Sequence, residues 1–217
     1  MLIKIGAALL LLLSLVAPAA AGTITISEVL YDATGADDGK VFVEIWGKAG
    51  TDLSGIFLQG VNGADGKVTH SVDLKNKTIP TDGFFVVADC TSTGSCSVSS
   101  VDMTVSNFDL QNGPDSVRLW TSNGVLDALA YGTPPSSGYF GGESKAAADV
   151  AAGSSLARTY ANVDTDDNLA DFKTLTTPTP GSGTLKVVAV PLPESAGLGA
   201  AGLLLMAVMR RRRRSVT

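Results

Sequence analysis

Side chains that commonly carry catalysis are scarce in this chain of 217 residues. It has a single histidine, His70, and two cysteines. A Ser-His-Asp hydrolase would depend on His70, and no Gly-x-Ser-x-Gly elbow accompanies it. His70 lies in the alternating segment 67–73, which favours a strand with a surface histidine. No motif points to a carboxylate pair for glycoside hydrolysis either, so the sequence predicts a protein that is not an enzyme.

A hydrophobic run long enough for an ordinary membrane span is also missing. The apolar segment near the C-terminus, residues 196–209, has 14 residues, whereas a full span takes about 20. A bilayer would hold the basic cluster that follows it on the cytoplasmic side. That cluster comprises Arg210, Arg211, Arg212, Arg213 and Arg214. We expect a temporary membrane segment, with a permanent anchor as the alternative.

A proline-glutamate motif precedes this segment, with Pro191, Pro193 and Glu194 in the order Pro-Leu-Pro-Glu-Ser. The motif, the short apolar segment and the arginines together resemble the PEP-CTERM sorting signal of Gram-negative bacteria. The resemblance implies processing by an exosortase-type protease or transpeptidase. Residues 192–196 are also similar to a sortase signal, with Ser195 and Ala196 in place of Thr and Gly.

The N-terminus has the pattern of an export signal. Lys4 precedes an apolar stretch, residues 5–16, and small residues at Ala19 and Ala21 match the A-x-A cleavage rule. We expect signal peptidase to remove residues 1–21. An uncleaved anchor is the alternative, and the short apolar core disfavours it.

Basic residues are few between the two terminal signals. This region has 10 basic residues, which are the 16 of the whole chain less Lys4 and the five terminal arginines. It has 20 acidic residues, which are the 21 of the whole chain less Glu194, so its net charge is about −10. Such a surface repels nucleic acid and anionic lipid. Most of the acids are Asp, which suits turns and Ca²⁺ ligation.

One acidic segment resembles the start of a calcium loop, with Asp164, Asp166 and Asn168 as candidate ligands. An EF-hand would need Gly and Glu where Leu169 and Leu175 stand. A solvated turn is the simpler interpretation. We therefore expect no cofactor, with Ca²⁺ as the one candidate.

Cys90 and Cys96 are separated by a short polar segment. In an exported protein, two cysteines this close predict a local disulfide, which would pin a surface loop rather than hold the domain together.

The chain between the signals is predicted to be all-β, because short β-branched and aromatic segments alternate with Asn-Gly and Asp-Gly turns. The predicted strands are residues 23–30, 41–46, 55–60, 68–74, 83–89, 116–120, 125–131 and 156–160. Residues 139–155 favour a loop, with one short helix over 144–152 as the competing interpretation. The predicted core contains Ile26, Val43, Ile45, Phe85, Val87, Val117, Leu119 and Leu126.

An ordered series of short segments covers most of this region and resembles the bacterial lamin-tail domain. The segments include residues 26–31, 35–38, 42–45, 52–55, 83–87, 112–115, 117–119, 124–127, 155–158, 166–168 and 177–181. The resemblance implies an immunoglobulin-like β-sandwich without family-wide catalytic residues. The domain would occupy residues 22–181, followed by a linker and sorting motif (182–195), the membrane segment (196–209) and the basic tail (210–217).

Glu28 and Glu44 lie on predicted strands beside apolar neighbours. We expect structural roles for both, either as acceptors of strand-end hydrogen bonds or as partners of Arg118 or Arg158.

Two functions fit these features. The first is an exported, non-catalytic cell-surface or extracellular-matrix module that passes through an inner-membrane intermediate. The second is a Ca²⁺-assisted binding module for extracellular polysaccharide or a surface protein.

Overall fold

The computed structural model describes residues 24–108, 110–134 and 138–186. These ranges form ten strands and one short helix. The elements are β1 (Thr25–Leu30), β2 (Phe42–Trp46), β3 (Phe57–Asn62), β4 (Val68–Asp73), β5 (Phe84–Asp89), β6 (Met103–Val105), β7 (Asp115–Thr121), β8 (Gly124–Tyr131), β9 (Ser155–Arg158), α1 (Asn168–Asp171) and β10 (Phe172–Leu175).

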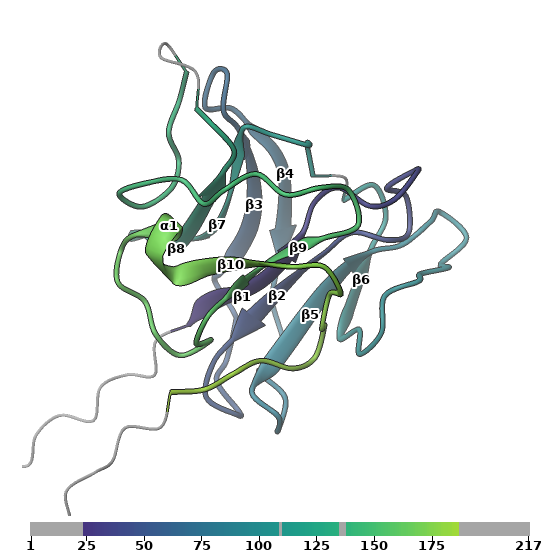
Figure 1. Ribbon diagram of the computed structural model, residues 1–217. Coiled ribbons are helices and arrows are strands. Elements are labelled where there is room, and N and C mark those ends of the chain that lie inside the picture. Colours follow the sequence, from purple (N-terminus) through teal and green to yellow (C-terminus); the bar gives the residue numbers. More distant parts are fainter. Residues whose placement is uncertain (1–23, 109, 135–137, 187–217) are drawn as a thin grey trace, which may run out of the picture. The chain divides into compact units, whose positions relative to one another are not determined.

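The strands form two sheets, seen as two layers in Figure 1. One sheet has the order β10-β9-β1-β2-β5-β6 and the other has the order β4-β3-β7-β8. Neighbouring strands are antiparallel except β5 and β6, which are parallel. The prediction of an all-β sandwich is therefore confirmed.

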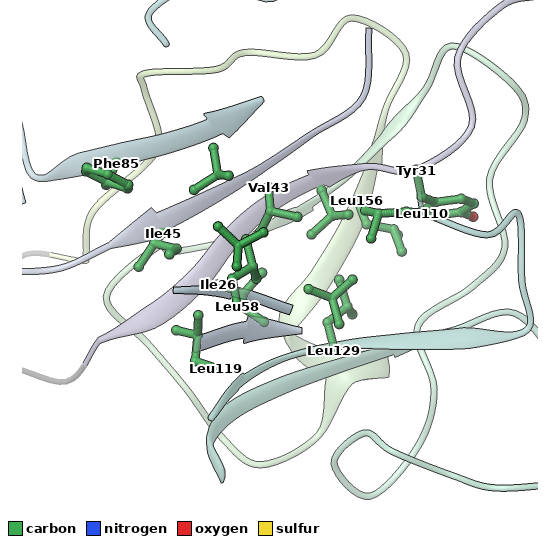
Figure 2. Close-up of a cluster of buried hydrophobic side chains, with 14 of the residues drawn as sticks. Ile26, Tyr31, Val43, Ile45, Leu58, Phe85, Leu110, Leu119, Leu129 and Leu156 are labelled. Carbon is green, nitrogen blue, oxygen red and sulfur yellow. The ribbon is translucent and has the colours of Figure 1, made fainter. Parts of the chain in front are cut away.

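Apolar side chains from both sheets meet in one core, shown in Figure 2. In β2, alternation sends Val43 and Ile45 to the core and Phe42 and Glu44 to the opposite face. Burial of each large aliphatic side chain contributes roughly 1.5–3 kcal/mol. The rings of Tyr31 and Tyr131 stack with centroids 4.0 Å apart.

Seven of the eight predicted core residues are buried, and Leu126 is not. Its side chain is 44% exposed. The pairing of β7 with β8 passes from Leu119–Asp127 to Trp120–Val125 and so skips Leu126 at a β-bulge. Asp127 takes the inward position next to it and is fully buried. The prediction for Leu126 was wrong because hydrophobicity alone does not reveal which of two neighbours faces inward.

The outer face of the six-stranded sheet is also covered. A second apolar cluster contains Leu30, Phe42, Val86, Ala88 and Cys90, with Cys96, Val98 and Val101 packed against it. The loop after β5 therefore lies over this face. The segment 177–186, called the C-terminal strap below, bonds to Glu28 and Glu44 on the same face. Burial on both faces explains why β1 and β5 are buried along their whole length.

The eight predicted strands are all present, with ends shifted by up to two residues. The sequence pattern did not reveal β6, β10 or α1, which are three or four residues long. Residues 144–152 form no helix, and Ala147 instead pairs with Tyr131 at the edge of β8. Within the described ranges, no helix has the length and apolar character of a membrane span. The predicted signal peptide, sorting motif, membrane segment and basic tail lie outside the described residues.

Candidate functional site

The most concentrated group of charges in the described residues surrounds Arg158 at the end of β9. Its Nη2 donates to both carboxylate oxygens of Asp127, at 2.9 and 3.0 Å. Its Nη1 donates to Asp171 at 2.7 Å and to Asp164 at 3.2 Å, and its Nε donates to the carbonyl of Ile26 at 3.0 Å. The guanidinium lies over the ring of Phe172, 4.6 Å from its centroid. A single buried cation thus has three carboxylate partners.

A fourth acid, Glu143, lies beside this group. One carboxylate oxygen each from Asp127, Glu143 and Asp164 lies within 4.8 Å of the others. Burial, with repulsion from Asp127, raises the pKa of Glu143 to about 8. Burial also raises the pKa of Asp127 to about 6, although Arg158 opposes this shift. Near neutral pH, this group can therefore hold a proton, and closely spaced carboxylates are also the ligands that Ca²⁺ prefers.

Of the three predicted calcium ligands, Asp164 belongs to this cluster of three carboxylates. Asn168 is fully buried at the start of α1, where its amide bonds to the backbone of Ala128 and Ala130 in β8. Asp166 is exposed, and its own N–H donates to Asp164. Because the amide of Asn168 joins α1 to β8, the structure gives this residue a framework role.

Sequence reasoning missed Asp127 and Glu143 as members of the group. Asp127 carried one signal, since it is an acid inside an otherwise apolar strand. Glu143 carried none, because it reaches the group from a loop far from Asp164 in sequence.

Glu28 and Glu44 form a second buried acidic pair, opposite each other on β1 and β2. Both bind the C-terminal strap: Thr179 donates its N–H and hydroxyl to Glu28 at 2.9 and 2.8 Å, and the Gly181 N–H donates to Glu44 at 2.6 Å. Ser27 also donates to Glu44, at 2.6 Å. Burial raises the pKa of Glu44 to about 7.

The expected ion pairs of Glu28 and Glu44 with arginine were wrong, whereas their role as hydrogen-bond acceptors is confirmed. Arg158 binds the aspartates described above. Arg118 lies over Trp120, 4.7 Å from the ring centroid, and donates to Gln59 at 2.9 Å.

Cys90 and Cys96 form a disulfide with their Cα atoms 4.7 Å apart, as predicted. The closed loop packs on the β1–β2 loop at Gly39, whose carbonyl accepts from the N–H of Ser97 at 2.8 Å. A Cβ at Gly39 would lie 3.1 Å from Thr91, and the positive φ of 77° also favours glycine there. The disulfide therefore braces the β1–β2 loop.

Comparison of the chain with protein-family models, curated proteins and solved structures finds no match.

Proposed function

We propose that this protein is an exported, non-catalytic module of the cell surface or extracellular matrix. Its domain would be a lamin-tail-like, immunoglobulin-like sandwich, delivered by a signal peptide and sorted by an exosortase-type C-terminal signal. The observation that carries the proposal is the disulfide between Cys90 and Cys96. Disulfides of this kind form and persist outside the reducing cytosol.

The buried charges support a structural role for the domain's polar interior. Every buried side-chain nitrogen or oxygen in the described part of the chain has a hydrogen-bond partner. Arg158 joins β9 to β8 and α1 through Asp127 and Asp171. Glu28 and Glu44 hold the C-terminal strap. These acids stabilise the sandwich and its strap, which is the structural role expected of buried charges in a non-catalytic surface module.

The two ends of the described domain lie close together, on the same side in Figure 1. The hydroxyl of Thr25 donates to the carbonyl of Ala161 at 2.6 Å, and the Ala161 N–H donates to Thr184 at 2.8 Å. The side chain of Asn162 exchanges two hydrogen bonds with the backbone of Lys186, at 2.9 and 2.7 Å. This arrangement suits a module attached by its end, because the strap is fixed to the domain up to its last described residue.

Mass spectrometry of the protein from cells and from medium tests the proposal. We expect an N-terminus at Gly22, a C-terminus at or near Glu194, and oxidised cysteines. Replacing Pro191, Pro193 and Glu194 with alanine should leave the C-terminus uncut. Intact Arg210–Arg214 on the mature protein would point to a permanent anchor. An intact Met1 together with two free thiols would overturn export itself.

The cluster of three carboxylates from Asp127, Glu143 and Asp164 favours a second candidate function, a Ca²⁺-assisted binding module. A cation that binds only the folded state stabilises it by about 2.7 kcal/mol at a hundredfold excess over the dissociation constant. Millimolar Ca²⁺ should then raise the unfolding temperature, Glu143→Gln should reduce that rise, and Asp166→Asn should not. An unchanged unfolding temperature would contradict calcium binding and leave the first proposal, a non-catalytic module without a calcium site.

A further inference from the structure

A polar hollow of about 400 Å³ opens beside the single histidine, away from the Arg158 group. It is lined by Asp38, Thr69, His70, Asp89, Asn107 and Gln111. These residues come from both sheets and two loops: the β1–β2 loop, β4, the end of β5, and the segment that crosses from β6 to β7. The volume lies within the range of small-ligand sites, roughly 300–1,000 Å³.

The framework holds the walls of this hollow in place. Asp89 is 1% exposed, and its two carboxylate oxygens accept the N–H groups of Gly39 and Phe108, both at 2.9 Å. The buried ring of Phe108 meets the ring of His70 edge-on, with centroids 6.2 Å apart. The carbonyl of Gln111 accepts from the hydroxyl of Tyr131 at 2.8 Å. The Cys90–Cys96 loop braces the strand connection that carries Asp38, so the disulfide also supports this site.

The side chains that line the hollow exclude several classes of ligand. His70 is the one basic side chain among the six, and two are carboxylates, which disfavours phosphate, sulfate and acidic ligands. None is aliphatic, and the polar imidazole of His70 is the one aromatic ring, which disfavours lipid. Asp38, His70 and Asp89 do not form one of the close ligand groups found in the described ranges, which disfavours a single metal ion. An ammonium ligand has no acceptor atom, so it could not use the amide N–H donors of Asn107 and Gln111.

We infer that this hollow binds a neutral saccharide unit, as part of a surface polysaccharide. The Asp38 carboxylate accepts hydrogen bonds, the two amides both donate and accept them, and the hydroxyl and imidazole do either. Adjacent sugar hydroxyls need this mixture of donors and acceptors. The side chains of Asp38, Asn107 and Gln111 are exposed and form no hydrogen bond to another described residue, so they are free to bind a ligand. The choice of a polysaccharide rests on the proposed surface function.

His70 makes the test direct, because a protein without a histidine tag has one set of imidazole NMR signals. The probes are the methyl pyranosides of glucose, galactose, mannose and N-acetylglucosamine, titrated into the full-length protein. At least one should shift the His70 signals saturably, with a dissociation constant of about 1 mM or weaker. Galacturonate should bind less well than the galactoside.

A matched pair of variants keeps the test specific. Asn107 and Asn76 are both exposed and both have a left-handed backbone, with φ of 57° and 61°. Glycine accepts this conformation, so either change removes only an amide. Asn107→Gly should weaken binding roughly tenfold, whereas Asn76→Gly should leave it unchanged.

Three outcomes would overturn the inference: no response of His70 to any neutral pyranoside, wild-type affinity in Asn107→Gly, or tighter binding of galacturonate than of the galactoside. Export is tested separately through the termini and thiols of the mature protein, so failure of one proposal is distinguishable from failure of the other.

Discussion

Arg158 on β9 and Asp127 on β8 form a fully buried ion pair that joins the two sheets. Nη2 of Arg158 lies 2.9 and 3.0 Å from the two oxygens of Asp127, and both side chains are 0% exposed. Asp127 also accepts the N–H of Ile26, so the pair reaches β1 as well. Removing one partner of such a pair leaves an uncompensated charge in the interior.

Arg158→Met should therefore destabilise the domain by about 3–5 kcal/mol, because it leaves Asp127 and Asp171 buried without their cation. Arg118→Met is the matched control, since Arg118 lies over Trp120 and forms no ion pair in the described residues. We expect a cost below about 1 kcal/mol there. Urea unfolding of the two variants checks the difference, and equal costs would contradict a structural role for the Arg158 group.

The domain should be more stable at pH 5 than at pH 8. Glu44 has a pKa of about 7 when folded against an ordinary value of 4.5, so the folded state holds a proton that the unfolded chain releases. Its contribution is complete below pH 4.5 and is lost as the pH rises through 7. Glu143, with a pKa of about 8, acts in the same direction.

The expected loss of stability from Glu44 between pH 5 and pH 8 is on the order of 1–3 kcal/mol. Urea midpoints across this range measure it, and Glu44→Gln should flatten the curve. Greater stability of the wild type at pH 8 would show that the buried carboxylates are stabilised as anions.

The Cys90–Cys96 disulfide closes a short loop, so its loss should cost about 2 kcal/mol. The double Cys→Ser variant should stay folded, because the main core lies between the sheets and away from this loop. Circular dichroism and thermal unfolding of oxidised protein, reduced protein and the variant check this. Complete unfolding on reduction would show that the loop holds the outer apolar cluster together.

Val43→Asp should unfold the domain, because Val43 is 0% exposed in the core and an isolated buried carboxylate is very costly. Leu126→Asp introduces the same side chain at a position that is 44% exposed, and it should change stability by less than about 0.5 kcal/mol. Circular dichroism and urea unfolding distinguish the two. Severe destabilisation by Leu126→Asp would place that side chain in the core after all.

Sequence periodicity was enough to predict eight of the ten described strands and most of the core. Val43 and Ile45 illustrate why: side chains two residues apart in a strand share one face, and both are apolar. The disulfide was equally predictable, since two cysteines that are close in sequence can meet without long-range folding. Strands β6 and β10 were not, because both are short edge strands, and among their side chains only that of Phe172 is buried.

By itself, then, the sequence determined the fold class, most of the strands and the local disulfide, all of which depend on neighbours a few residues apart. Only the tertiary structure decided which polar residues are buried. Asp127 faces inward in place of Leu126 because Arg158, 31 residues away, compensates its charge. Glu28 is buried because Thr179, 151 residues away, supplies its hydrogen bonds. A buried polar group is tolerated only where a partner meets it, and long-range folding decides where that happens.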